Sequence, residues 1–61
     1  MMTSVAIVED NPTIRRSLQE WVDAAPGYRC VCVCGDAETA LKEVPKFKPD
    51  VVLMDIHLPG E

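Results

Sequence analysis

The 61-residue sequence lacks an apolar run of about 18 residues, the length needed to cross a membrane, so we expect no membrane span. It also lacks the basic start and long apolar stretch of a signal peptide, which predicts a cytoplasmic location. Basic residues are outnumbered by acids, six against ten. The resulting net charge of −4 argues against a segment that binds nucleic acid through its phosphates, and leaves cations as plausible ligands.

Cysteine is scarce and occurs at alternate positions, as Cys30, Cys32 and Cys34. An odd number at this spacing neither closes a disulfide framework nor matches the CxxC pattern of zinc and redox sites. On one face of a strand these residues would be spaced about 6.6 Å apart, two rises of about 3.3 Å, so a tetrahedral thiolate site would need a fourth ligand and considerable distortion. Packing of reduced thiols is the favoured interpretation.

The composition is that of a folded protein, with 48% apolar and 26% charged residues. The chain is shorter than the usual domain of about 100 to 150 residues, so it holds one unit at most, with a small core. It contains no internal repeat, low-complexity tract or linker between domains.

The apolar pattern of the first half predicts a strand followed by a helix. Residues 5–8 form a continuous apolar run that is typical of a strand covered on both faces. Asn11 and Pro12 are a helix cap and a first helical residue, and Pro26 with Gly27 ends the helix. The apolar stripe of this helix, which we expect to be buried against a sheet, consists of Ile14, Leu18, Trp21, Val22 and Ala25.

The second half predicts a strand, a shorter helix and a third strand. The second strand spans residues 28–34, and the second helix spans residues 37–44, with Asp36 as its cap and Pro45 as its end. Residues 51–54 form a third buried strand. The order β-α-β-α-β predicts an α/β fold with an open parallel sheet and helices packed on its faces.

Acidic residues follow two of these strands, because Glu9 and Asp10 end the first strand and Asp55 ends the third. In open parallel sheets, ligands bind beyond the carboxyl ends of the strands. Three carboxylates at one edge repel one another unless a cation such as Mg²⁺ neutralises them. A carboxylate beside such an ion can attack phosphorus, and Asp55 is the best candidate for an aspartyl phosphate. The alternative is that the acids only cap strand ends and turns.

Three motifs carry a resemblance to a known family: VAIVEDNP at residues 5–12, Ala40 with Leu41, and PDVVLMDIHLPG at residues 49–60. Together they resemble the first half of a response-regulator receiver domain of two-component signalling. The resemblance implies a flavodoxin-like, doubly wound sheet with strand order 2-1-3, cut after the third of five strands. Residues 1–61 are therefore expected to be an incomplete receiver domain with its first three strands and two helices.

The resemblance also implies roles for single residues. Asp55 corresponds to the phosphoacceptor, which takes a phosphoryl group from a sensor histidine kinase. Asp10 corresponds to a direct Mg²⁺ ligand, Glu9 to an acid that often acts through water, and His57 to the position whose backbone carbonyl binds the ion. Related proteins often carry a DNA-binding output domain, so the parent is expected to be a transcription regulator. The chain itself is expected to be no enzyme, and nothing in it recognises DNA.

Two further features concern partners. Pro59 and Gly60 resemble the turn that shapes the phosphorylation loop, and Arg15 and Arg16 on the first helix are secondary candidates for kinase contact. Residues 51–54 would leave an open hydrophobic strand edge, so we expect self-association through this strand, which would complete the sheet.

The sequence departs from the family in lacking the serine or threonine, the aromatic residue and the lysine of the later strands. Lysines 42, 46 and 48 are poorly placed to substitute, so phosphotransfer is expected to be impaired. Two alternatives stay open. One is a structural or self-associating fragment without chemistry. The other is a fragment of a Mg²⁺-dependent phosphotransferase or phosphatase, against which His57 counts, because such enzymes typically carry an aspartate there.

Overall fold

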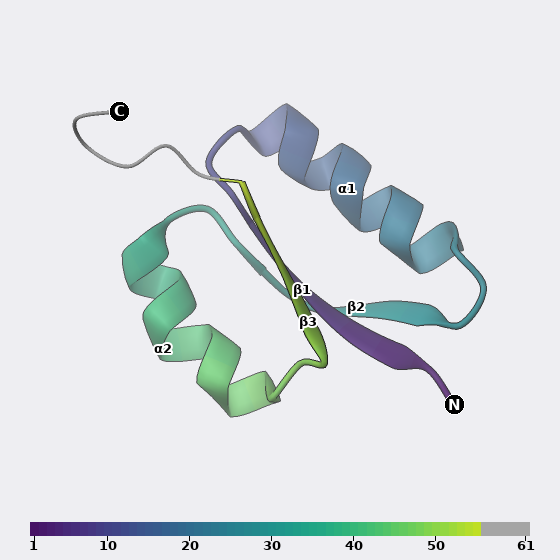
Figure 1. Ribbon diagram of the computed structural model, residues 1–61. Coiled ribbons are helices and arrows are strands. Elements are labelled where there is room, and N and C mark those ends of the chain that lie inside the picture. The colour runs from purple at the N-terminus through teal and green to yellow at the C-terminus, as the bar shows by residue number, and fades with distance from the viewer. Residues whose placement is uncertain (56–61) are drawn as a thin grey trace.

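The computed structural model describes residues 1–55 and contains the predicted elements in the predicted order (Figure 1). These are β1 (Thr3–Glu9), α1 (Pro12–Ala24), β2 (Tyr28–Cys34), α2 (Ala37–Phe47) and β3 (Val51–Asp55). The strands are parallel and lie in the order β2-β1-β3, with the helices on opposite sides of the sheet. The α/β fold and the strand order 2-1-3 are therefore confirmed. No helix in the described part of the chain is long and apolar enough to cross a membrane.

Strand β1 is the centre of the sheet and of the core. It pairs with β2 on one side and β3 on the other, and its last five residues, from Val5 to Glu9, are all buried. Ile7 and Val8 are the largest fully buried side chains. The uninterrupted apolar run predicted a strand covered on both faces, and this is what the structure has.

Helix α1 begins and ends as predicted. The Asn11 side-chain oxygen accepts hydrogen bonds from the backbone N–H groups of Thr13 (2.9 Å) and Ile14 (3.1 Å). Pro12 occupies the first helical position, where its missing N–H leaves no bond unmade. After the helix, Gly27 has a φ of 85°, a left-handed conformation that favours glycine.

Helix α2 runs beyond the predicted end at residue 44 and includes Pro45 in its last turn. Pro45 cannot donate to the carbonyl of Leu41, and its ring crowds that carbonyl, but its fixed φ is compatible with a helix, which continues to Phe47. The turn is closed instead by Lys48, whose N–H donates to the carbonyl of Val44 at 3.2 Å with a left-handed φ of 47°. At the other end, Asp36 caps the helix as predicted, by accepting from the N–H of Thr39 at 2.7 Å.

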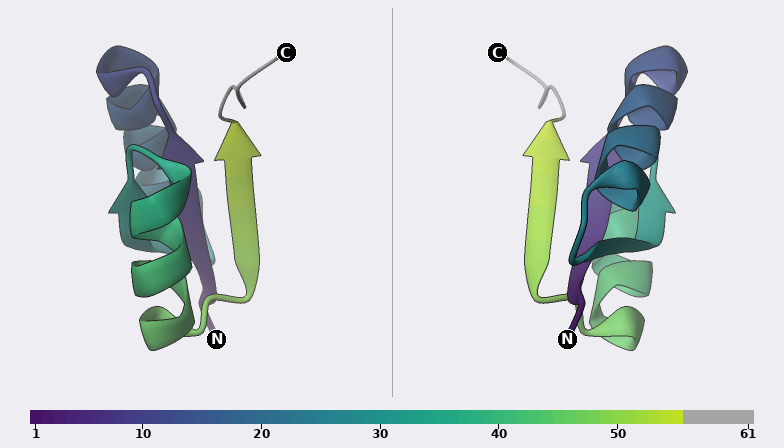
Figure 2. Two further views of the ribbon diagram at one scale, coloured as in Figure 1. Left: turned by 90° about the vertical axis from the view of Figure 1, so that its left-hand side faces the viewer. Right: turned by 90° about the vertical axis from the view of Figure 1, so that its right-hand side faces the viewer.

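Two predictions of burial are wrong. Trp21 and Ile14 of the α1 stripe are 71% and 45% exposed, and every residue of β3 is exposed. The reason is the position of the helices, which pack over β1 and β2 and leave β3 uncovered on both faces (Figure 2). An apolar pattern shows which side chains could be buried, not whether another element covers them. No helix or strand among the described residues covers the faces of β3.

Strand β2 contains a bulge that interrupts its alternation. Val5 pairs with Cys30 and Ala6 pairs with Cys32, so Val31 has no partner in β1. As a result, Val31 packs against the same core cluster as Cys32 and Cys34, although simple alternation predicts the opposite face.

The amino ends of β1 and β3 are joined by Ser4 and Asp50. The Asp50 carboxylate accepts hydrogen bonds from the backbone N–H of Ser4 (2.9 Å) and from its hydroxyl (3.1 Å). In return, the backbone N–H of Asp50 donates to the hydroxyl and to the carbonyl of Ser4, both at 3.0 Å. Two residues 46 positions apart are thus bonded through both main chain and side chain.

Candidate functional site

The acids at the carboxyl edge of the sheet lie together. Glu9 and Asp55 are direct register partners at the ends of the adjacent strands β1 and β3, and Asp10 follows Glu9. All three line one hollow of about 430 Å³. Its other lining residues are Asn11, Pro12 and Ile14, from the start of α1.

Glu9 is the buried member of this group, with an exposed fraction of 3%. One carboxylate oxygen, Oε1, accepts a hydrogen bond from the backbone N–H of Asn11 at 3.2 Å. The other, Oε2, is buried and has no hydrogen-bond partner among the described residues. Burial raises the pKa of Glu9, and the neighbouring charges of Asp55 and Asp10 raise it further, while the bond from Asn11 lowers it in part.

A cation suits this arrangement, because an unpartnered buried carboxylate oxygen and two exposed carboxylates face one hollow. Within residues 1–55, however, no three histidine, cysteine, aspartate or glutamate side chains are arranged to hold a metal ion. An ion in this hollow would therefore complete its shell with water, which is the usual behaviour of Mg²⁺. The predicted carbonyl ligand, at His57, lies outside the described residues, as do Pro59 and Gly60.

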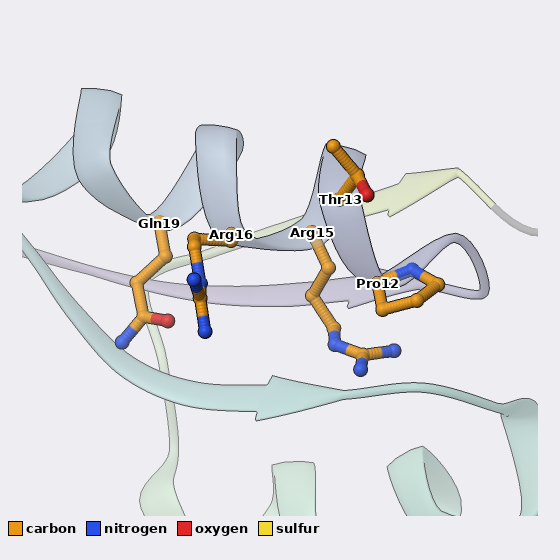
Figure 3. Close-up of a pocket in the computed structure, with 5 residues that line it drawn as sticks. All are labelled: Pro12, Thr13, Arg15, Arg16 and Gln19. Atoms are coloured by element: carbon orange, nitrogen blue, oxygen red, sulfur yellow. The ribbon is translucent and has the colours of Figure 1, made fainter.

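Arg15 has a role beside this site that the sequence did not reveal. Its guanidinium Nη1 donates to the backbone carbonyl of Glu9 at 3.0 Å. The same nitrogen also lies close to Gly35. A Cβ atom added at Gly35 would be only 2.7 Å from it, so a larger residue there would collide with Arg15. Arg15 is therefore hydrogen-bonded to the end of β1 and lies close to Gly35, in the loop after β2. Together with Arg16 and Gln19 it also lines a hollow of about 480 Å³ on α1 (Figure 3).

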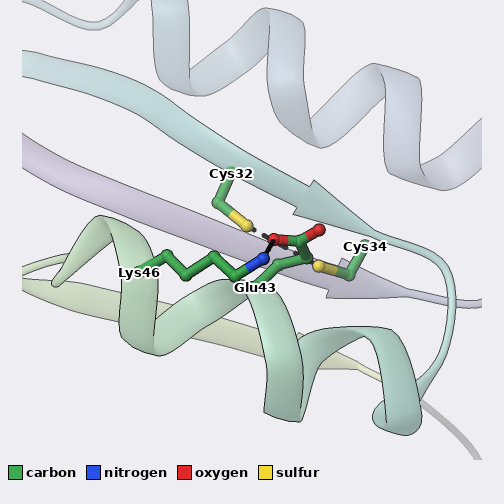
Figure 4. Close-up of polar contacts among 4 residues, drawn as sticks. All are labelled: Cys32, Cys34, Glu43 and Lys46. Carbon is green, nitrogen blue, oxygen red and sulfur yellow. Dashed lines mark hydrogen bonds and ion pairs between the residues drawn. The ribbon is translucent and has the colours of Figure 1, made fainter.

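The thiols of Cys32 and Cys34 belong to the core, as predicted. Both are buried beneath α2, with their sulfur atoms 3.6 Å apart, near the ion pair between Glu43 and Lys46 (Figure 4). Burial raises the pKa of Cys34 to about 11, with a further contribution from its hydrogen bond to Cys32. The Cys34 thiol therefore stays protonated at neutral pH and is a poor nucleophile.

Comparison with known families agrees with the fold and the acidic hollow. Residues 5–61 match the model of the response regulator receiver domain. This chain belongs to the receiver-domain family. The resemblance that the sequence motifs carried is thus confirmed.

Several curated proteins are similar to this receiver chain. It is 43% identical to a protein-glutamate methylesterase/protein-glutamine glutaminase of Syntrophus aciditrophicus, and 36% identical to one of Nitrosospira multiformis. Each match covers 95% of the receiver chain but only 17% and 16% of the relative. The response regulator GacA of Pseudomonas syringae is 34% identical over 97% of the chain and 28% of that protein.

The receiver chain thus spans about a sixth of the length of the methylesterases that it matches. The names of these relatives describe whole proteins, of which the matched segment is a small part. No solved structure matches the chain significantly.

Proposed function

We propose that this receiver chain is a phosphoacceptor and that Asp55 takes the phosphoryl group. The observation that carries the proposal is the pairing of Asp55 with Glu9 across two strands, in one hollow that also contains Asp10. Asp55 is exposed, so a phosphoryl donor can reach it, whereas Glu9 is buried and cannot be the acceptor. Membership of the receiver family supports the same assignment.

The donor in this proposal is a phosphohistidine of a sensor histidine kinase. An Asp55 carboxylate oxygen attacks phosphorus, a new P–O bond forms, and the P–N bond to the imidazole breaks. The electron pair of the broken bond stays on the imidazole nitrogen, which takes up a proton. The chain supplies the nucleophile and the surrounding charges and turns over no metabolite, so it acts as a signalling module and not as an enzyme.

Mg²⁺ is the proposed cofactor. Asp10 and Asp55 would bind it directly and Glu9 through water, with the carbonyl of His57 as a further ligand on the strength of the family resemblance. When bound, the ion screens the charge between the attacking carboxylate and the phosphoryl oxygens. The unpartnered Oε2 of Glu9 and its raised pKa support this assignment, because a nearby cation would offset both the burial and the repulsion from Asp55.

A DNA-binding output domain in a longer parent protein stays a prediction, as does the cytoplasmic location. The similar proteins include both methylesterases and a response regulator, so their names favour no single output.

The test is incubation of the chain with Mg²⁺ and acetyl phosphate, followed by intact-mass analysis. We expect one base-labile phosphoryl adduct that disappears in Asp55→Asn and decreases in Asp10→Asn. Glu20→Gln is the matched control, since it removes one exposed acid on α1 outside the hollow and should leave the adduct unchanged.

An adduct that survives in Asp55→Asn would overturn the assignment of the acceptor. A folded chain that forms no adduct would favour the structural alternative. Release of phosphate from many donor molecules per chain would favour a phosphatase.

A further inference from the structure

The backbone on both sides of Asp10 is held by one residue, Arg15. The backbone N–H of Arg15 donates to the carbonyl of Asn11 at 2.8 Å, a bond that begins the hydrogen-bond ladder of α1. The guanidinium of Arg15 donates to the carbonyl of Glu9 at 3.0 Å. Asp10 therefore lies in a short segment whose preceding and following carbonyl groups both accept hydrogen bonds from the same residue.

The bond from the guanidinium holds the peptide group that leads into Asp10. The carbonyl of Glu9 and the N–H of Asp10 belong to one planar peptide unit, so a donor that holds the carbonyl also sets the direction in which the chain leaves β1. The Glu9 carboxylate is held in turn by the N–H of Asn11, at 3.2 Å. The orientation of both acids in the hollow thus depends on the segment that Arg15 holds.

Arg15 reaches the Glu9 carbonyl just beyond the end of β2. The pairing of β1 with β2 ends at Val8 and Cys34, one residue before the pairing of β1 with β3 ends. Gly35 is the first residue after β2, and its closeness to Nη1 places the guanidinium at this point of the sheet. The side chain extends there from α1 (Figure 3). It supplies a hydrogen-bond donor to the last residue of β1 where the paired part of β2 has ended.

Gly35 provides the space for the guanidinium. A Cβ atom at this position would lie 2.7 Å from Nη1 and 3.6 Å from Cζ of Arg15, and it would meet no other described group within 4 Å. The backbone of Gly35 does not require glycine, because Gly27 is the glycine with a left-handed φ among residues 1–55. A close approach to Arg15 is therefore the structural reason for glycine at position 35.

We infer that Arg15 is a positioning residue of the acidic site, and that the missing side chain of Gly35 allows it to act. The inference rests on the proposed function, because the task assigned to Arg15 is to orient Asp10 and Glu9 toward Mg²⁺. Arg15 acts through the backbone and touches neither the ion nor the phosphoryl donor. Its contacts lie in β1, α1 and the loop after β2, so they do not depend on what covers β3.

Backbone amide NMR on the full 61-residue chain tests the positioning without metal. Arg15→Met keeps an unbranched stem but removes the donor, so it should shift the amide signal of Asp10, which shares a peptide unit with the Glu9 carbonyl. Gly35→Ala should shift the same signal in the same direction, because its Cβ displaces the guanidinium. Arg16→Met is the matched control. It removes the same charge from an exposed side chain in the same hollow on α1 and should leave the signal in place.

Mg²⁺ titration followed by the same amide signals tests the effect on the site. We expect Arg15→Met and Gly35→Ala each to weaken Mg²⁺ binding about tenfold, the lower end of the range for groups that orient metal ligands. The losses should not add, since without the guanidinium the Cβ at position 35 meets no described group. Arg15→Lys keeps a charge and a donor and should recover part of the affinity. Arg16→Met should bind Mg²⁺ like the original chain.

Circular dichroism accompanies each measurement, and Gly35→Ala is the milder variant, because the atom that it meets is the end of a flexible side chain. An unshifted Asp10 signal in Arg15→Met overturns the inference. So does an original chain with the amide spectrum of an unfolded polypeptide, which would lack the contact.

Equal effects of Arg15→Met and Arg16→Met would overturn the inference by showing that charge alone matters. Additive losses in the doubly substituted chain would overturn the part assigned to Gly35. If the Asp10 signal shifts as expected but the original chain binds no Mg²⁺, the proposed cofactor fails while the hold of Arg15 on the backbone is supported. Normal Mg²⁺ binding in Arg15→Met, with the Asp55 adduct intact, would leave the proposed function standing and refute the positioning by Arg15.

Discussion

Replacing Asn11 by alanine is expected to lower the free energy of unfolding by about 1 kcal/mol. The Asn11 oxygen accepts two hydrogen bonds at the start of α1, so the substitution leaves the N–H groups of Thr13 and Ile14 without their partner. Both residues are exposed, and water can replace the lost acceptor. The cost therefore falls near the middle of the range of about 0.5 to 2 kcal/mol for helix caps, rather than at its top.

Thermal unfolding followed by circular dichroism measures this cost, which corresponds to a fall in Tm of about 4 to 8 °C in a chain of this size. All variants are compared at one chain concentration, because association would change the apparent stability. Asn11→Asp keeps the cap but adds a carboxylate beside Glu9 and Asp10, so it should recover stability mainly when Mg²⁺ is present. If Asn11→Ala were as stable as the original chain, the reasoning would be refuted. The same holds if the Tm of Asn11→Asp did not change on addition of Mg²⁺.

Three further predictions concern titratable groups. Because the folded chain raises the pKa of Glu9 above 4.5, its stability should fall as the pH rises from 4.5 through that raised value. Denaturant titrations at several pH values should show this fall in the free energy of unfolding, and Glu9→Gln should abolish it. The same fall in Glu9→Gln would show that another group causes it. Asp50 behaves oppositely, because the backbone N–H and then the hydroxyl of Ser4 lower its pKa from 3.8. Its stabilisation is present above pH 3.8 and is lost as the pH falls through the lowered pKa, so Asp50→Asn should differ least from the original chain in strong acid. Iodoacetamide at about pH 8 should alkylate the half-buried Cys30 before the buried Cys34, and equal rates, read by peptide mass mapping, would argue against a packed thiol core.

The parts of the fold that were predictable are those set by local chemistry. The Asn11–Pro12 pair fixes the start of α1, because a side-chain acceptor and a residue without an N–H are what a first helical turn requires. The continuous apolar run before Glu9 predicted a central strand for the same kind of reason. Pro45 misled the prediction because a proline removes only its own N–H, here the one that would donate to Leu41, and α2 continues for two residues beyond it.

Burial was harder to predict, because it depends on the neighbours that tertiary structure provides. Trp21 follows a helical stripe that suits a covered sheet, yet it borders the uncovered strand β3 and stays exposed. The bulge at Val31 arises from the pairing of β2 with β1. The alternating cysteines and valines of β2 contain no signal that predicts it.

The candidate site shows the same division. That Glu9, Asp10 and Asp55 would meet followed from the rule that parallel strands present their carboxyl ends at one edge. Which of them would be buried did not follow, because burial depends on how the start of α1 packs against the end of β1, where the N–H of Asn11 donates to the Glu9 carboxylate and Arg15 donates to the Glu9 carbonyl. Two adjacent arginines on a helix give no signal that one of them reaches back to a carbonyl of the preceding strand.

The hydrogen bonds between Ser4 and Asp50 lie at the amino ends of β1 and β3, but their consequence is felt at the carboxyl ends of these strands. From these bonds onward, the residues of β1 and β3 pair one to one without a bulge, and the last pair is Glu9 with Asp55. A shift of a single position would set a side chain of the other face against Glu9 and turn the carboxylate of Asp55 away from the hollow. The meeting of the acids is thus decided five residues earlier, by a serine and an aspartate that take no part in it.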